Sequence, residues 1–87
     1  MESIKTEDLS GLLAAPVVKR SVMIAGHATS VSIEKPFWDA LKRLAKAQGI
    51  SINQLVGEID EARPKTLHGN LSSAIRLYVL HAQRSIS

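Results

Sequence analysis

The sequence predicts a mostly α-helical fold with one short β-ribbon. Apolar and small polar residues alternate between residues 20 and 33, which is typical of a strand with one buried face. Three later segments, starting near residues 36, 51 and 70, repeat apolar residues at helical spacing. With 87 residues, the chain has enough material for a single small domain.

The strand pattern is clearest just before the first helix. Val31 and Ile33 alternate with Ser30 and Ser32, so we expect the apolar pair to face the core and the serines to face outward. The alternation continues less regularly back to residue 20. Gly26 either separates two short strands or marks a bulge within one longer strand.

Start and stop signals delimit the first two helices. Pro36 suits the first turn of a helix, where its missing N–H would have no partner. Gly49 ends that helix, and Ser51 is a good N-cap for the next one. We expect the second helix to run to about Ala62, because Pro64 disfavours helical backbone at the residue before it.

The two ends of the chain differ in pattern. Residues 1–18 show no sustained period and predict a flexible N-terminal arm, with partial docking through one amphipathic turn as the alternative. Residues 19–63 would form the ribbon and two helices. Residues 64–87 would form a loop and a C-terminal helix, capped by Asn70 or Ser72, that packs on the core or on a partner.

Composition limits the classes of protein. The chain has no cysteine, which excludes disulfides and thiolate metal sites, and its three histidines are too scattered to suggest a metal. No apolar run is long enough to cross a membrane, so we expect a cytoplasmic protein. No nucleophile–base pair or phosphate loop is evident, so neither an enzyme nor a cofactor is expected.

Size and strand chemistry predict a homodimer. A domain this short buries only roughly 60% of its unfolded surface and is marginally stable alone. A lone strand also cannot satisfy its backbone groups. We therefore expect two copies to pair their strands antiparallel across a two-fold axis, giving a two-stranded sheet between chains.

Charge is unevenly distributed along the chain. Eleven Lys and Arg against eight Asp and Glu give a net charge of +3. Between residues 19 and 51 the only acidic residues are Glu34 and Asp39. The basic residues of this stretch are Lys19, Arg20, Lys35, Lys42, Arg43 and Lys46. A basic half that is doubled in a dimer is compatible with a nucleic-acid partner.

The order of strand, helix, Gly-x-Ser turn and second helix resembles the ribbon-helix-helix family of the Arc and MetJ type. The resemblance is carried by the strand Thr-Ser-Val-Ser-Ile, the helix that starts Phe-Trp-Asp-Ala-Leu, and the turn Gly-Ile-Ser-Ile-Asn-Gln-Leu-Val. The longer string Lys-Arg-Ser-Val…Gly-His-Ala-Thr-Ser resembles a small bacterial subgroup of that family with no settled function. The resemblance implies a homodimer whose ribbon enters the major groove of double-stranded DNA.

The same resemblance implies roles for individual residues. Ala28, Ser30 and Ser32 would face the bases, although short side chains discriminate poorly between bases, and the serines could equally be the solvated face of a strand. A clamp on a flanking phosphate would consist of Gly49, Ser51, Ile52 and Asn53, with an ordinary helix–helix turn as the alternative.

Two further sets complete the implied site. Additional DNA contacts would come from Arg20, His27, Thr29, Lys42, Arg43 and Lys46, although the three basic residues after residue 40 could be a solvated helix face. The dimer core would consist of Val31, Ile33, Phe37, Trp38, Leu41, Leu44, Leu55 and Ile59.

The sequence therefore predicts a sequence-specific or semi-specific DNA-binding protein, a transcriptional regulator. The alternative is a protein-association module or antitoxin-like partner that uses the same fold to dimerise without reading DNA. In either case the C-terminal helix is the candidate contact for a protein partner.

Overall fold

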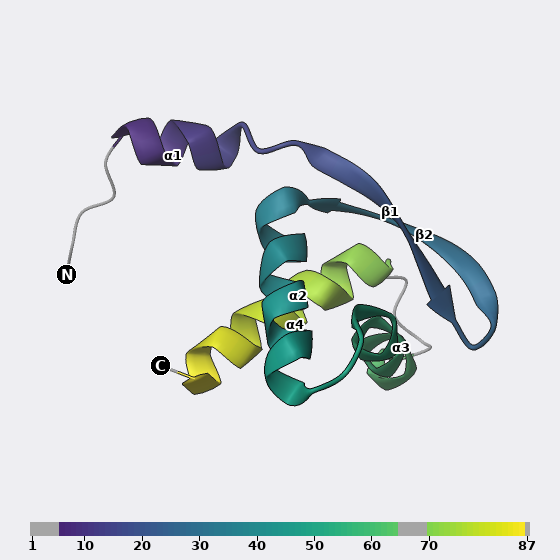
Figure 1. Cartoon of the computed structure of the whole chain (residues 1–87). Coiled ribbons are helices and arrows are strands. Elements are labelled where there is room, and N and C mark those ends of the chain that lie inside the picture. Colours follow the sequence, from purple (N-terminus) through teal and green to yellow (C-terminus); the bar gives the residue numbers. More distant parts are fainter. Residues whose placement is uncertain (1–5, 65–69, 87) are drawn as a thin grey trace.

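The computed structural model of the protein describes residues 6–64 and 70–86. Its elements, in chain order, are α1 (Thr6–Leu13), β1 (Val17–Ile24), β2 (His27–Glu34), α2 (Lys35–Gln48), α3 (Ile52–Ala62) and α4 (Leu71–Ile86). Figure 1 shows the β1–β2 ribbon lying across one side of α2, α3 and α4, with α1 at the opposite end of the ribbon from its turn. The predicted fold class, mostly helical with a short ribbon and an added C-terminal helix, is confirmed.

The ribbon is a hairpin within one chain. β1 and β2 pair antiparallel, with Val17 opposite Glu34 and Ile24 opposite His27. The expectation that two copies supply the two strands does not describe this ribbon. Gly26 instead separates two strands, which was one of the two alternatives.

The turn explains this pairing. Ala25 and Gly26 both have positive φ angles, 50° and 81°. Two such residues form the hairpin turn whose twist matches that of the flanking strands. A two-residue connection also closes at small entropic cost. The local partner strand is therefore favoured over one from a second copy.

The core lies between the inner face of the ribbon and the three following helices. The ribbon contributes Val22, Val31 and Ile33, each at most 2% exposed. Every residue of the predicted dimer core except Phe37, which is half-buried, is buried within the single chain. The remaining buried apolar residues are Trp38, Ala40, Leu41, Leu44, Ala45, Leu55, Val56, Ile59, Leu71, Ile75 and Val79.

The helix boundaries follow the predicted chemistry. Gly49 has the left-handed conformation (φ 72°), and its N–H donates to the Lys46 carbonyl. The Ser51 hydroxyl accepts a hydrogen bond from the Gln54 N–H at 3.0 Å. The Asn70 side-chain oxygen accepts one from the Ser73 N–H at 2.9 Å. These caps satisfy backbone groups that a helix end leaves unpaired.

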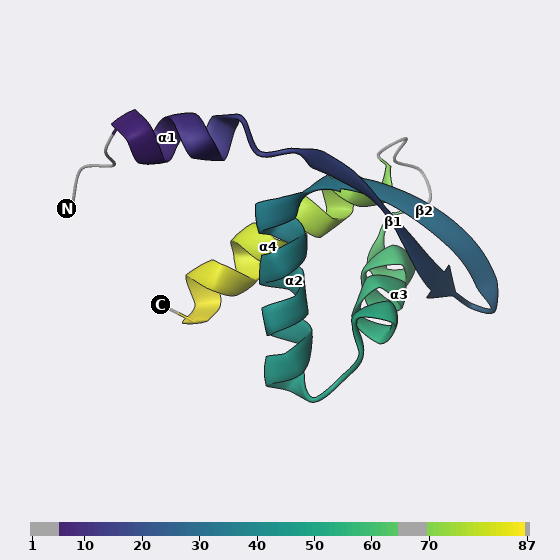
Figure 2. The same cartoon turned by 45° about the horizontal axis from the view of Figure 1, so that its top comes forward.

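The two terminal helices differ in how they pack. In α4, Leu71, Ile75 and Val79 are buried against the core. By contrast, α1 occupies residues where an arm was expected and stands clear of the helices in both views (Figure 1 and Figure 2). The radius of gyration is 14.1 Å, against about 12 Å for a compact chain of this length. In the described part of the chain, no helix is long and apolar enough to cross a membrane.

Candidate nucleic-acid interface

The outward face of the ribbon carries mostly small or polar side chains, with Met23 as a large apolar one. Ala28, Ser30 and Ser32 are all exposed on it, as the alternation predicted. Their cross-strand neighbours on β1 are Met23, Ser21 and Lys19 respectively. These three are also exposed. The six residues Lys19, Ser21, Met23, Ala28, Ser30 and Ser32 are called the outward face below.

Sequence reasoning missed the half of this face that β1 supplies. The signal was present, because Lys19, Ser21 and Met23 alternate with Arg20 and Val22. Because the partner strand was expected from a second copy, this alternation did not predict that Lys19, Ser21 and Met23 belong to the outward face. Once β1 pairs with β2, these side chains necessarily lie beside Ser32, Ser30 and Ala28.

Two predicted DNA contacts lie on the inner face instead. Thr29 is half-buried opposite Val22. Arg20 is half-buried, and its guanidinium carbon lies 5.5 Å from the centroid of the Trp38 ring. Within the described residues, the Arg20 Nε is buried and has no hydrogen-bond partner. Arg20 thus makes a cation–π contact with the core and points away from the outward face. His27 is exposed beside the turn.

The basic residues of α2 are apart from the ribbon's outward face. The Lys35 Nζ lies 2.7 Å from an Asp39 carboxylate oxygen, and the Lys42 Nζ lies 3.9 Å from the other. The hydrogen bond from Lys35, with smaller contributions from nearby positive charges, lowers the pKa of Asp39. Asp39 therefore neutralises part of this helix face, whereas Arg43 and Lys46 are exposed.

The predicted phosphate clamp lies where α3 begins. The Asn53 side-chain oxygen accepts a hydrogen bond from the Met23 N–H at 3.2 Å, so the first turn of α3 lies against the end of β1. Ser51 is exposed, and Ile52 packs partly against the core. The positive end of the α3 dipole is thus close to the tip of the outward face, where it would favour an anion.

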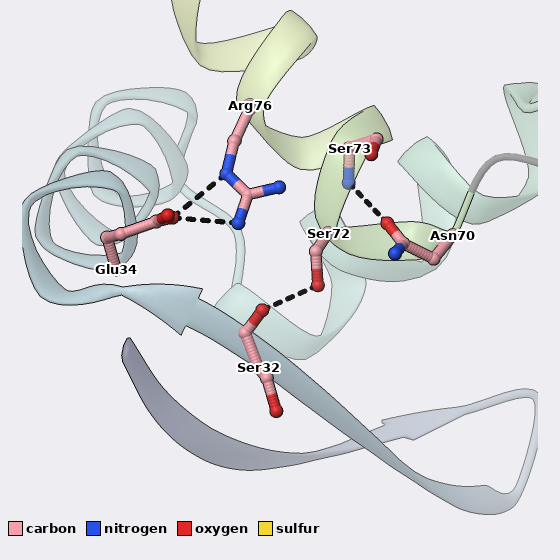
Figure 3. Close-up of polar contacts among 6 residues, drawn as sticks. All are labelled: Ser32, Glu34, Asn70, Ser72, Ser73 and Arg76. Atoms are coloured by element: carbon pink, nitrogen blue, oxygen red, sulfur yellow. Dashed lines mark hydrogen bonds and ion pairs between the residues drawn. The ribbon is translucent and has the colours of Figure 1, made fainter. Parts of the chain in front are cut away.

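A second side chain fixes the other strand. The Ser72 hydroxyl donates to the Ser32 carbonyl at 2.6 Å, as Figure 3 shows. In an antiparallel pair, alternate residues point their backbone groups away from the partner strand. Met23 and Ser32 are such residues, and each is bonded by a side chain from the first turn of a helix. These contacts anchor the ribbon to the helices and partly close its two edges.

An ion pair holds the end of β2. The Arg76 Nε and Nη2 lie 2.9 and 2.8 Å from one Glu34 carboxylate oxygen (Figure 3). A backbone hydrogen bond at Glu34, followed by the hydrogen bond from Arg76, lowers the pKa of this carboxyl group. Arg76 also lies over Phe37, 5.9 Å from the ring centroid. α4 therefore fixes the junction between β2 and α2.

Other predicted features have separate locations. Asp60 and Arg63, three residues apart at the end of α3, pair at 2.7 Å. His81 is exposed on α4, and His68 lies outside the described residues. Among the described residues, no group of three His, Asp or Glu side chains could hold a metal ion.

The comparisons with known proteins agree with this architecture. A family model described as a ribbon-helix-helix domain matches residues 17–83. Among solved structures, the chain is similar to an uncharacterized protein from Bordetella pertussis Tohama I, with 26% sequence identity and a TM-score of 0.69 over 93% of this chain and 70% of that one. No curated protein matches. The chain therefore belongs to the ribbon-helix-helix domain family, whose fold is in general a dimerising, DNA-binding or regulatory fold and not an enzymatic one.

Proposed function

We propose that the protein binds double-stranded DNA by placing the outward face of its hairpin in the major groove, and that it acts as a transcriptional regulator. The composition of that face is the observation that carries the proposal. It joins Lys19 and three serines to Ala28 and the apolar Met23, and none of its six residues is a carboxylate. Paired strands lie about 4.8 Å apart, and the groove is about 12 Å wide. A two-stranded ribbon therefore fits.

The same face supports semi-specific rather than strict recognition. Serine hydroxyls can bond to several base edges, whereas strong discrimination comes from long bidentate side chains. Arg20 is long enough to make such contacts, but it lies on the inner face of the ribbon and contacts Trp38 instead. We infer that phosphate contacts from Lys19 and the first turn of α3 supply most of the affinity.

We further propose that the functional unit is a homodimer with one complete hairpin per copy. Two such hairpins can occupy successive major-groove turns, about 34 Å apart. Pairing the two β2 edges would instead give a four-stranded sheet with its outer strands about 14 Å apart. Such a sheet is wider than the groove. The contact between copies is therefore expected away from the hairpins.

The proposal is tested by titrating a labelled random duplex at about 50 and about 200 mM salt, with fluorescence anisotropy as the readout. Affinity should fall steeply as salt rises. Ser30→Glu, which puts a carboxylate in the centre of the outward face, should reduce affinity at least tenfold. Ala47→Glu, an equal charge change on an exposed position of α2, is the matched control.

Two results would refute DNA binding by the ribbon. The first is a folded protein that binds no duplex at about 50 mM salt. The second is equal affinity for the Ser30→Glu and Ala47→Glu variants. If neither result is found, a selection from random duplexes will define the preferred sequence, and we expect a weak consensus.

A protein-association role is the second candidate, and it has its own observation. Leu77 and Leu80 on α4 are 68% and 57% exposed, whereas Ile75 and Val79 of the same helix are buried in the core. Leu77 and Leu80 are three residues apart on one face of α4, and a contiguous apolar patch is the kind of surface at which another protein docks. If this were the function, Ser30→Glu would leave partner binding intact while Leu80→Glu would abolish it.

A further inference from the structure

The outward face of the ribbon changes in character along its length. It consists of three cross-strand pairs, which are Lys19 with Ser32, Ser21 with Ser30, and Met23 with Ala28. The positive charge lies at the end farthest from the turn, and hydroxyl groups occupy the centre. The pair nearest the turn is apolar. The face therefore has a basic end, a polar centre and an apolar end.

Met23 is the large apolar side chain of this face, and it is 50% exposed. The other large apolar side chains that are exposed in the described part of the chain lie on α1, on α4 and at Val17. A single exposed apolar side chain is common on protein surfaces. Met23 differs because its cross-strand neighbour, Ala28, is also apolar and exposed. Both residues would lose contact with water if the ribbon entered a groove.

The two side chains lie close together across the strands. The Met23 N–H bonds to Asn53 and not to β2, so Met23 and Ala28 face each other as a pair without mutual backbone hydrogen bonds. The Cα atoms of such a pair are about 4.5 Å apart, which brings the side chains into contact range. Methionine is unbranched and flexible. It can therefore extend beside the alanine methyl group to give one continuous apolar surface.

The backbone that carries Met23 is held by the first turn of α3. The Asn53 side-chain oxygen accepts a hydrogen bond from the Met23 N–H at 3.2 Å. In both views the turn end of the ribbon projects past the helices (Figure 1 and Figure 2). A phosphate at the start of α3 would therefore fix the apolar pair at a defined place relative to the bases.

The chemistry of the major groove offers one apolar group to such a surface. Adenine, guanine and cytosine present hydrogen-bond donors and acceptors there, whereas thymine adds a methyl group at C5. An apolar pair set against a donor or acceptor would remove its water without replacing the hydrogen bond, which costs free energy. Against a thymine methyl group, the pair buries apolar surface on both sides. 5-Methylcytosine carries the same methyl group beside an amino donor, which carboxylates accept, and none of the six outward-face residues is a carboxylate.

We propose that Met23 and Ala28 recognise the 5-methyl group of a thymine, so that the ribbon prefers an A·T base pair at the turn end of its footprint. This inference rests on the DNA binding proposed above and adds a base preference to it. Lys19 and the start of α3 supply contacts that tolerate any sequence, and the apolar pair supplies the choice of base. The weak consensus then contains a thymine at this position.

Replacing thymine with deoxyuridine tests the methyl contact directly, because it removes the methyl group and keeps every donor and acceptor. A labelled alternating A·T duplex and its deoxyuridine counterpart are titrated with the full chain at about 50 mM salt, where phosphate contacts are strong. The alternating sequence offers a thymine in every register of the ribbon. Fluorescence anisotropy should show about fourfold tighter binding to the thymine duplex, which is the effect of one buried methyl group.

Three variants assign the preference to a side chain. Met23→Ser should bind the two duplexes equally, because a hydroxyl replaces the apolar surface, whereas Met23→Leu should keep the preference for thymine. Lys19→Gln changes the other end of the same face. It should weaken binding to both duplexes and leave their ratio unchanged. Circular dichroism verifies that each variant is folded, which we expect because Met23 is half exposed and bonds to Asn53 through its backbone.

The outcomes separate this inference from the proposed function. Equal affinity of the wild-type protein for the thymine and deoxyuridine duplexes overturns thymine recognition and leaves DNA binding intact. A preference that persists in Met23→Ser also overturns it, because other residues would then contact the methyl group. An alternating G·C duplex, with and without 5-methylcytosine, is the further arm: a preference for 5-methylcytosine without one for thymine overturns the choice of base. A folded protein that binds none of these duplexes overturns the proposed DNA binding as well.

Discussion

At the scale of single residues, two glycines occupy opposite backbone conformations. Gly49 ends α2 with φ at +72°, whereas Gly57 lies within α3 and has no positive φ. A Cβ added at either position would meet nothing within 4 Å. The two sites therefore differ in backbone strain and not in available space.

This contrast predicts opposite effects of the same substitution. Gly49→Ala should lower the free energy of unfolding by about 1 to 2 kcal/mol, because an L-residue is strained in the left-handed region. Gly57→Ala should raise it by about 0.5 to 1 kcal/mol, because alanine loses less conformational entropy in a helix. Urea denaturation measures both. Equal signs for the two changes would contradict this account of the α2 C-cap.

The Glu34–Arg76 pair predicts a dependence of stability on pH. A backbone hydrogen bond at Glu34, followed by the hydrogen bond from Arg76, holds the folded-state pKa of Glu34 below its ordinary value of 4.5, so these bonds to the ionised carboxylate stabilise the protein above that pH. The contribution is lost as pH falls through the folded-state pKa. The urea midpoint of Glu34→Gln should therefore be below that of wild type at pH 7, and the gap should close on acidification.

Glu58→Gln is the control for this measurement, since Glu58 is exposed on α3. We expect it to change the midpoint little at pH 7. A gap between wild type and Glu34→Gln that stays constant from pH 7 to pH 3 would show that the ionised Glu34 carboxylate does not provide the stabilisation.

At the scale of elements, the position of the ribbon depends on side chains from helix starts. Asn53 bonds the Met23 N–H and Ser72 bonds the Ser32 carbonyl. Ser72 is 9% exposed, whereas the adjacent Ser73 is exposed. α4 therefore holds β2 through one buried hydroxyl, which fixes the orientation of the outward face relative to the helices.

Ser72→Ala should leave the Ser32 carbonyl without its partner and lower the free energy of unfolding by about 1 to 2 kcal/mol. Hydrogen exchange should also increase at amides of β2. Ser73→Ala removes a hydroxyl from the same turn and should be close to neutral. If the two variants behave alike in both measurements, the Ser72 contact does not secure the ribbon.

At the scale of the whole molecule, α4 completes the core. Ile75 is fully buried, and Val79 is 2% exposed. The side chains of α4 cover α2, α3 and β2 together, which makes the last helix part of the domain that presents the ribbon. A shorter chain ending after α3 would expose the core that these residues cover.

Ile75→Ala should consequently lower the free energy of unfolding by about 2 to 5 kcal/mol, through lost burial and a residual cavity. Leu80→Ala, at a site that is 57% exposed, should cost well under 1 kcal/mol. Thermal and urea unfolding measure both changes. A small effect of Ile75→Ala would mean that α4 contributes little to the stability of the domain.

Local signals in the sequence were sufficient for the elements and for one face of the ribbon. Gly49 and Ser51 act over one helical turn, and the alternation of Val31 and Ile33 with the serines acts over five residues. Such effects depend on backbone conformation and side-chain period, so they can be read without knowing the partner surface. The outward position of Ala28, Ser30 and Ser32 followed from them.

Only the tertiary structure decided which strand pairs with β2 and what covers each face. The turn at Ala25 and Gly26 depends on a positive φ at an alanine, which sequence rules do not favour. Arg20 could be assigned to the core only once Trp38 was placed beneath it. The sequence therefore determined the ribbon, its outward serines and the helix ends. Contacts between distant segments decided that one chain completes the ribbon and core, because pairing and burial depend on which surfaces meet.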